Sequence, residues 1–395
     1  MNGIQTMAKA LAEGAPAPSL FRSFWQAGFE SAAHVNRHGA RVDMLARTQH
    51  DRFVREDFVR LRDLGILVAR EGIRWHLVDR AGHFDFSSLR SVVEAAEANG
   101  IQVIWNLCHY GSPDGVDLFS PRFVDRFARY TAAVASFIRD STDSVSFYSP
   151  INEISFLSWA AGEVGYIYPY GRGRGTELKR NLVRAVIAGS EAIWAVDRRA
   201  RLLHCDPIIE VVAPTDRPDL ARAAADVSES QFEAWDMIAG GYHPDLGGHP
   251  RYLDIVGANY YFSNQWEFPE STLPWDEGKD DHRRIPLVHL LERLYRRYHR
   301  PLFISETSHI GSGRARWVSE VADQVRLARA RGIPVEGICL YPIIDRPDWD
   351  DPDHWHNSGL WDLRDEGGRM ERHLCHEYAD RFRIVREGLR QAGCE

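Results

Sequence analysis

Two glutamates each close a short apolar segment, and a pair of carboxyl groups is what glycoside hydrolysis requires. Glu153 ends residues 145–153 (VSFYSPINE), and Glu306 ends residues 301–306 (PLFISE). In this reaction one carboxyl group is protonated and gives its proton to the leaving oxygen, while the other is ionised. In a retaining enzyme the ionised group attacks the anomeric carbon. The two segments therefore predict catalytic carboxyl groups that face each other across a pocket.

Polar side chains at other predicted strand ends suit the same chemistry. Arg70 and Tyr261 are suited to keeping a carboxylate ionised, because a nearby cation and a hydrogen bond both lower the pKa of a carboxyl group. Asn152 is suited to a hydrogen bond with a sugar hydroxyl beside the scissile bond. The remaining candidates would bind the sugar through its hydroxyl groups or by stacking: Glu30, His109, Asn259, Asp348 and Trp349.

Each candidate alone has an ordinary structural explanation. An isolated Asn-Glu pair such as Asn152-Glu153 is usually a polar turn, Arg70 alone is more often part of a structural ion pair, and His109 alone is more often a hydrogen-bonded histidine near the core. The prediction depends on the joint pattern, in which each polar residue lies at the exit of a different apolar segment.

Eight apolar segments alternate with amphipathic helices along the chain. The predicted strands cover residues 23–30, 66–70, 101–107, 145–153, 200–205, 253–259, 301–306 and 335–341. The predicted helices cover residues 52–64, 89–98, 121–139, 177–200, 229–238, 287–298, 317–331 and 374–391. Alternating β and α segments indicate a parallel sheet, and eight such units predict a single (β/α)8 TIM barrel. The carboxyl ends of its strands would bring the candidates to one face.

Composition narrows the class of partner. The chain has 395 residues, of which 44% are hydrophobic and 26% charged, and its formal net charge is −8. A negative charge without basic runs argues against nucleic-acid partners and anionic membranes, and no apolar run approaches transmembrane length. We expect no metal and no organic cofactor, and a β-glycoside, either a small molecule or an oligosaccharide, as the partner. The sequence is compatible with a homo-oligomer.

The cysteines and the N-terminal segment indicate a cytoplasmic protein. The five cysteines are scattered and odd in number, without zinc-ligand spacing, which is typical of free thiols in a reducing compartment. Residues 1–20 are small and polar and lack the apolar core of a signal peptide. We therefore expect a poorly ordered leader over residues 1–20 and one catalytic barrel over residues 21–395.

Six segments, in order along the chain, resemble the motifs of one enzyme family. They are Arg70-x4-Trp75, Asn106–Tyr110 (NLCHY), Tyr148–Glu153 (YSPINE), Asp254–Tyr261 (DIVGANYY), Phe303–Glu306 (FISE), and Tyr341–Trp349 with Gly359–Asp362 behind it. The family is glycoside hydrolase family 1, the β-glucosidase and β-galactosidase family of clan A. The similarity extends from about residue 24 to about residue 365.

The resemblance implies a role for each candidate. It implies that Glu153 is the acid/base and Glu306 the nucleophile, that Arg70 and Tyr261 surround the nucleophile, and that Asn152 binds the sugar 2-hydroxyl. The outer hydroxyls would be bound by the remaining set: Glu30, His109, Asp348 and Trp349. The chain departs from the family at Glu30 (usually glutamine), Ile154 (usually proline), Thr307-Ser308 (usually Asn-Gly) and Asp348 (usually glutamate). These positions leave the sugar identity open, and the absence of a Ser/Lys/Tyr set near Asp348 favours an unphosphorylated sugar.

The sequence predicts a retaining exo-β-glycosidase of the β-glucosidase or β-galactosidase type. A transglycosylase or an endo-glycanase of clan A is an alternative, with subsites lined by Trp159, Trp266, Trp275, Trp317 and Trp355. An alternative of another class is a catalytically weak carbohydrate-binding barrel. The aglycone, the linkage and the oligomeric state stay open, and residues 162–176 are expected to shape the aglycone side.

Overall fold

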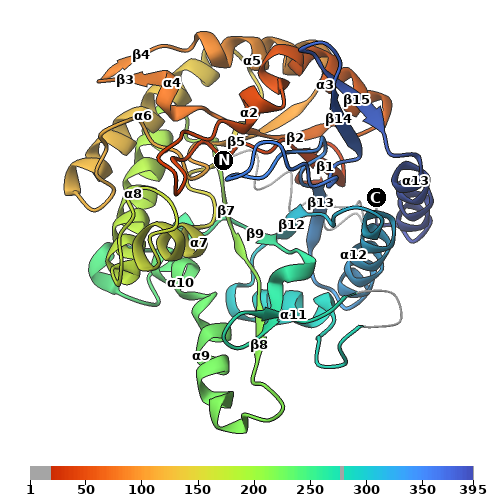
Figure 1. Ribbon diagram of the computed structural model, residues 1–395. Coiled ribbons are helices and arrows are strands. Elements are labelled where there is room, and N and C mark those ends of the chain that lie inside the picture. The colour runs from red at the N-terminus through yellow and green to blue at the C-terminus, as the bar shows by residue number, and fades with distance from the viewer. Residues whose placement is uncertain (1–18, 276–279, 395) are drawn as a thin grey trace, which may run out of the picture.

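The described residues form a closed barrel of eight parallel strands with helices around it, which confirms the predicted (β/α)8 fold (Figure 1). The structure is a computed structural model that describes residues 19–275 and 280–394. The predicted leader over residues 1–20 therefore lies, up to residue 18, outside the described residues. The barrel strands, in chain order, are β1 (Trp25–Gly28), β2 (Val68–Gly72), β5 (Gln102–Asn106), β6 (Phe147–Ser149), β7 (Arg201–Pro207), β9 (Ile255–Asn259), β12 (Leu302–Thr307) and β13 (Val335–Leu340).

Each barrel strand pairs in parallel with its neighbours, and β13 closes the barrel onto β1 with Trp25 opposite Ile338. The ring of helices outside the strands contains α3 (His50–Asp63), α5 (Ser87–Asn99), α6 (Pro121–Arg139), α8 (Gly175–Val196), α10 (Glu233–Ala239), α11 (Leu287–Tyr298), α12 (Gly313–Ala330) and α13 (His376–Gln391) (Figure 1). Helix α6 illustrates how the sequence specifies them. Pro121 lies in its first turn, the Ser120 hydroxyl caps it by accepting from the Arg122 N–H, and its apolar face is buried.

Several elements differ from the predictions. The predicted strand over residues 145–153 is shorter, because β6 ends at Ser149 and a turn leads to Glu153. The predicted helix over residues 374–391 begins at His376, because Met370–Leu374 forms β15, which pairs with β14 (Trp361–Asp365). The structure also contains elements that were not predicted: β3 (Asp79–Arg80) with β4 (His83–Phe84), β8 (Glu210–Val212) with β10 (Gln265–Glu267) and β11 (Ser271–Thr272), and helices α2 (Met44–Arg47), α4 (Trp75–Val78), α7 (Ile154–Ser158) and α9 (Ala221–Ser230).

Apolar side chains fill the barrel near the amino ends of its strands, which is its lower end. Polar groups occupy the opposite, upper end, where the carboxyl ends of the strands lie. Phe21 enters from below, with its ring centroid 5.5 Å from those of Phe147 and Phe303. Because side chains alternate along a strand, Val68 in this core layer puts Arg70 on the same inner face, one layer higher. At the upper end, Gly28 lets the Tyr341 ring approach, since an added Cβ would lie 2.0 Å from that ring.

Two findings concern the state of the cysteines and the possibility of a helix that crosses a membrane. Cys108, Cys205, Cys339, Cys375 and Cys394 are free thiols, as predicted. Within residues 19–275 and 280–394, no helix combines the length and the apolar character needed to cross a bilayer.

A buried ionic cluster ties β2 to α3 and β15. His50 donates from Nδ1 to Asp57 (2.8 Å) and from Nε2 to Glu71 (3.0 Å), and Arg372 pairs with Asp57 at 2.8 Å. Burial alone would lower the pKa of His50, but the charge of Glu71 and the hydrogen bonds to Asp57 and Glu71 raise it to about 9. The cluster therefore contains a buried imidazolium.

This cluster predicts a pH dependence of stability. The pKa of His50 is raised above the value of ~6.5 expected in the unfolded chain, so its contribution is fully present below that pH and is lost as pH rises through about 9. We expect the free energy of unfolding to fall by on the order of 2 kcal/mol over this range in the wild type, and much less in His50→Gln. Urea denaturation at pH 6.5 and 9.5 measures this, with the exposed His83→Gln as control. The same pH slope in wild type and His50→Gln would contradict it.

Candidate active site

Glu306 lies on β12 at the upper end of the barrel, where two groups bind its carboxylate. Arg70 Nη1 donates to Oε1 at 2.9 Å, and the Tyr261 hydroxyl donates to Oε2 at 2.8 Å. Arg70 and Glu306 are both buried, so their charges are poorly screened by water. A cation and a hydroxyl donor on the two carboxylate oxygens stabilise the ionised form.

An irregularity in β12 aims this glutamate into the site. The register between β9 and β12 shifts between Ile304, which pairs with Ala258, and Glu306, which pairs with Asn259. Such a bulge changes the direction of a side chain, and bulges are common beside active sites. Ser305 also takes part, because its Oγ donates to Asn259 Oδ1 at 2.5 Å.

Glu153 lies in a turn beyond β6, in a left-handed conformation with φ 48°. Its backbone N–H donates to the Cys205 carbonyl oxygen on β7 at 2.8 Å. Its side chain accepts two hydrogen bonds, from Asn259 Nδ2 to Oε1 at 2.8 Å and from the Tyr110 hydroxyl to Oε2. No cation pairs with it among the described residues.

Burial and the charge of Glu306 raise the pKa of Glu153 to about 8, although the hydrogen bonds from Tyr110 and Asn259 oppose this rise. At neutral pH the Glu153 carboxyl group therefore carries a proton. The two glutamates therefore have unlike surroundings within a single network, because Glu306 is paired with the Arg70 guanidinium and Glu153 accepts from an amide and a hydroxyl.

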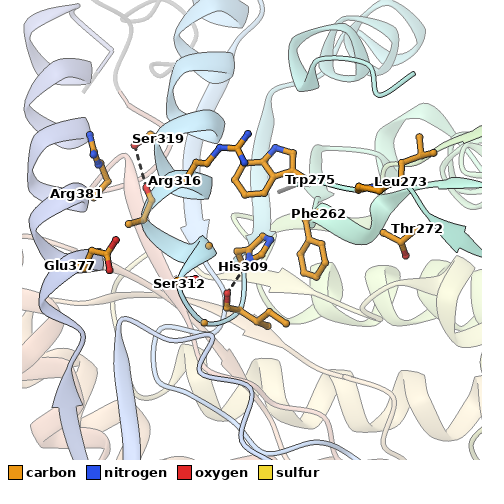
Figure 2. Close-up of a pocket in the computed structure, with 15 residues that line it drawn as sticks. Phe262, Thr272, Leu273, Trp275, His309, Ser312, Arg316, Ser319, Glu377 and Arg381 are labelled. Atoms are coloured by element: carbon orange, nitrogen blue, oxygen red, sulfur yellow. Dashed lines mark hydrogen bonds between the residues drawn. The ribbon is translucent and has the colours of Figure 1, made fainter. Parts of the chain in front are cut away.

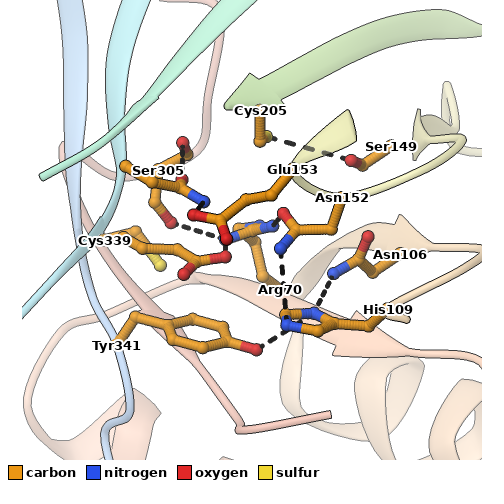
Figure 3. Close-up of polar contacts among 12 residues, drawn as sticks. Arg70, Asn106, His109, Ser149, Asn152, Glu153, Cys205, Ser305, Cys339 and Tyr341 are labelled. Atoms are coloured by element: carbon orange, nitrogen blue, oxygen red, sulfur yellow. Dashed lines mark hydrogen bonds and ion pairs between the residues drawn. The ribbon is translucent and has the colours of Figure 1, made fainter. Parts of the chain in front are cut away.

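Asn152 and Arg70 connect the two glutamates (Figure 3). Arg70 Nη2 donates to Asn152 Oδ1 at 3.0 Å, so one guanidinium contacts both Asn152 and Glu306. The Asn152 amide nitrogen lies 3.2 Å from the Tyr110 hydroxyl and 3.4 Å from His109 Nε2. The buried Asn152 side chain thus has a fixed orientation beside both carboxyl groups.

His109 and Glu30 form the side of the site nearest β1. Asn106 Nδ2 donates to His109 Nδ1 at 2.8 Å, and the Tyr341 ring is parallel to the imidazole. Burial and the charge of Arg70 lower the pKa of His109 far below its usual value, so its ring is neutral. Glu30 lies 3.8 Å from His109 and 3.3 Å from Arg346 Nε, and burial raises the pKa of Glu30 while Arg346 opposes the rise.

Asp348 and Trp349, at the end of the segment Tyr341–Trp349, lie in a loop at the rim of the barrel. Trp349 is half-buried, with its ring centroid 5.6 Å from that of Tyr110 and 6.0 Å from that of Phe156. Asp348 Oδ1 accepts from the backbone N–H of Asp350 at 2.8 Å, and its Oδ2 lies 3.3 Å from His356. Asp348 therefore stabilises its own loop in this structure.

The structure thus joins seven predicted residues in one bonded network: Glu153, Glu306, Arg70, Tyr261, Asn152, Asn259 and His109. Glu30 adjoins it through His109, Trp349 contacts it through Tyr110, and Asp348 accepts hydrogen bonds within the rim loop. Tyr110, Ser305 and Arg346 were not predicted. Only Tyr110 had a signal in the sequence, because it directly follows His109 at a predicted strand end.

The structure contains a surface cavity of about 820 Å3 whose lining includes neither of the paired glutamates (Figure 2). It is lined by Phe262, Trp275 and His309 from loops on the upper face and by Arg316 and Glu377 from α12 and α13. None of the predicted catalytic and sugar-binding residues lines it, but Trp275, which was expected to line a subsite in the endo-glycanase or transglycosylase alternative, does. Among the described residues that line this cavity, Glu377 alone carries a carboxyl group, whereas the network contains Glu153 and Glu306, which are linked through Arg70, Asn152 and Tyr110.

No site of metal type accompanies the network. Within residues 19–275 and 280–394, no three His, Cys, Asp or Glu side chains come together in the manner of metal ligands. The network described above contains carboxyl groups, amides, hydroxyls, the His109 imidazole and the Arg70 guanidinium.

Comparison with known proteins shows the fold. No protein-family model matches the chain, and no curated protein sequence matches it. The β-glucosidase from Thermotoga maritima in complex with methoxycarbonyl-substituted glucoimidazole superposes with a TM-score of 0.73 at 15% identity, over 93% of this chain and 98% of its own. The β-glycosidase from Pyrococcus horikoshii superposes with a TM-score of 0.71 at 18% identity, over 88% of each chain.

A family 1 β-glucosidase from Thermotoga maritima, in complex with isofagomine lactam, superposes with a TM-score of 0.69 at 14% identity, over 85% of this chain and 87% of its own. At these identities the likeness shows the fold. It confirms that the barrel resembles those of glycoside hydrolase family 1 β-glycosidases.

The coupling between the two glutamates predicts the effect of removing one charge. In Glu306→Gln we expect the pKa of Glu153 to fall below about 8, because the negative charge of Glu306 is one of the two main causes that raise it. A 13C NMR titration of the Glu153 side-chain carboxyl group measures this. Asp348→Asn, which removes a carboxylate at the rim, serves as control. An unchanged Glu153 pKa in Glu306→Gln would show that the two groups are not coupled.

Proposed function

We propose that this chain is a retaining exo-β-glycosidase that hydrolyses unphosphorylated β-linked glycosides through a covalent glycosyl-enzyme. The observation that carries the proposal is the contrast between the surroundings of the two glutamates. Arg70 and Tyr261 stabilise the charge of Glu306, whereas burial and that same charge keep Glu153 protonated. A nucleophile must be ionised and a general acid must be protonated, so the two environments match the two roles.

The reaction would proceed in two steps on these residues. Glu306 attacks the anomeric carbon while Glu153 gives its proton to the leaving oxygen, whose bond to carbon breaks. The ester at Glu306 carries no negative charge, so one cause of the raised pKa of Glu153 disappears. Glu153 then accepts a proton from water, and that water cleaves the ester with a second inversion.

The surroundings support a terminal sugar as the group that is bound. Three buried residues lie on the side of the network nearest β1: Glu30, His109 and Tyr341. Trp317, one of the tryptophans that could line an extended cleft, is buried and donates to Thr307 Oγ1 at 2.8 Å. This arrangement supports an exo-acting site, in which Asn152 would bind the 2-hydroxyl and Trp349 would stack against the ring.

The stereochemistry of the first product tests this proposal. We expect 1H NMR during hydrolysis of aryl β-glycosides of several sugars to show the β anomer first, because two inversions give retention. Glu306→Ala should show no turnover above background, since it has no nucleophile. First appearance of the α anomer would contradict a covalent intermediate at Glu306.

A further inference from the structure

Tyr110 is a hydroxyl partner of Glu153 that lies outside the set predicted from the sequence. Its OH group donates to Glu153 Oε2 and lies 3.2 Å from Asn152 Nδ2, which donates to it. The residue is buried, and its ring packs against His109 and Phe156. The hydroxyl is therefore fixed by contacts on both sides of the oxygen.

The backbone holds Tyr110 and Glu153 face to face at a conformational cost. Both have left-handed backbones, with φ 65° at Tyr110 and φ 48° at Glu153. Such conformations are unfavourable at non-glycine residues and persist where the surroundings enforce them. Here the Asn152 N–H donates to the Cys108 carbonyl oxygen at 2.9 Å, which ties the two turns together directly beside the pair.

The two carboxyl oxygens of Glu153 have different kinds of hydrogen-bond partner, an amide nitrogen at Oε1 and a hydroxyl at Oε2. Oε1 accepts from Asn259 Nδ2, and the orientation of this amide is set by Ser305, which donates to Asn259 Oδ1. An amide nitrogen can only donate, so Oε1 remains an acceptor. The proton of the neutral acid therefore belongs on Oε2, next to a hydroxyl that can both donate and accept.

We propose that Tyr110 is a positioning residue that keeps the transferable proton of Glu153 on Oε2 and reverses its hydrogen bond when Glu153 changes charge. The hydrogen bond from Tyr110 to Oε2 described above corresponds to the ionised carboxylate; in the acid form the bond is reversed, and Oε2–H donates to the Tyr110 oxygen. When this proton moves to the glycosidic oxygen, whose bond to carbon breaks with its electron pair, Tyr110 donates its own O–H to the new carboxylate. In the second step a proton from water returns to Oε2. The inference rests on the proposed acid/base role of Glu153.

The effect of Tyr110 on the pKa of Glu153 follows from the strengths of two hydrogen bonds, the one between Tyr110 and the neutral acid and the one between Tyr110 and the carboxylate. A bond to the charged carboxylate is roughly twice as strong as one between neutral groups, so Tyr110 stabilises the ionised form more. The hydroxyl thus lowers the pKa of Glu153, against the effects of burial and Glu306. Its removal should raise that pKa.

Tyr110→Phe tests the proposal, because it keeps the ring and removes only the hydroxyl. We expect the basic limb of kcat/KM against pH to move up by about half a unit to one unit. At pH 7, kcat for alkyl glycosides should fall about tenfold, since their leaving groups need the proton. Dinitrophenyl glycosides, which leave without protonation, should be much less affected. A carboxyl 13C titration of Glu153 should report the same pKa shift.

The matched control is Tyr130→Phe, which removes another buried tyrosine hydroxyl, bonded to the Leu107 carbonyl oxygen at 2.9 Å. The basic limb of its kcat/KM against pH should equal that of the wild type.

If the wild type is active and Tyr110→Phe shows the wild-type basic limb and the wild-type dependence on the leaving group, the inference is overturned and the proposed function stands. If the wild type hydrolyses no β-glycoside and forms no adduct, the proposed function and this inference both fail. If Tyr110→Phe does not fold, the wild-type Tyr110 Cζ resonance must shift where Glu153 titrates, and a constant resonance overturns the inference.

Discussion

The buried ion pair between Arg70 and Glu306 is the contact on which the rest of the site depends. Arg70 donates to the Glu306 carboxylate, to the Ser305 carbonyl oxygen and to Asn152, so one guanidinium links β2, β6 and β12 at the upper end of the barrel. Loss of one partner of a buried pair leaves an uncompensated charge and typically costs about 3–5 kcal/mol. The apolar layer below, with Phe21 at its base, keeps water away and so preserves the strength of the pair.

The same pair gives two chemically identical side chains different properties. Glu306 has a cation and a phenol as partners, whereas Glu153 has an amide, a phenol and the charge of Glu306 itself. Environments that separate the pKa values of two titratable groups in this way are typical of acid and base pairs. Asn259 serves both sides, since it donates to Glu153 and lies opposite Glu306 across the bulge in β12.

Much of the fold and part of the site could be predicted because both follow from local pattern. Apolar segments that alternate with amphipathic helices indicate a barrel, and the polar residue after each segment marks its catalytic face. The left-handed turn at Glu153 was not predictable, since it depends on backbone hydrogen bonds from Glu153 to Cys205 in β7 and from Asn152 to Cys108 in the loop after β5. The contact between Tyr110 and Glu153, 43 positions apart, likewise exists only once the barrel has closed.

The rim shows where a local pattern is least informative. Asp348 and Trp349 are adjacent in sequence, yet one stabilises its own loop and the other packs against Tyr110. The β14–β15 hairpin and the sheet of β8, β10 and β11 were missed because none of their strands has a continuous buried apolar run: β11 is exposed, β15 is half-buried, and the others mix buried residues with more exposed ones. Hydrogen-bond partners and loop paths of this kind depend on tertiary contacts that a single sequence does not contain.

The most direct measurement is the intact mass after incubation with activated 2-deoxy-2-fluoro β-glycosides of glucose, galactose, mannose and fucose type. These reagents accumulate a covalent adduct only if an enzyme nucleophile attacks the anomeric carbon. We expect one equivalent of glycosyl adduct, mapped by peptide analysis to Glu306. An adduct on another residue, or no adduct with any of these sugars in folded protein that hydrolyses the parent glycosides, would contradict Glu306 as the nucleophile.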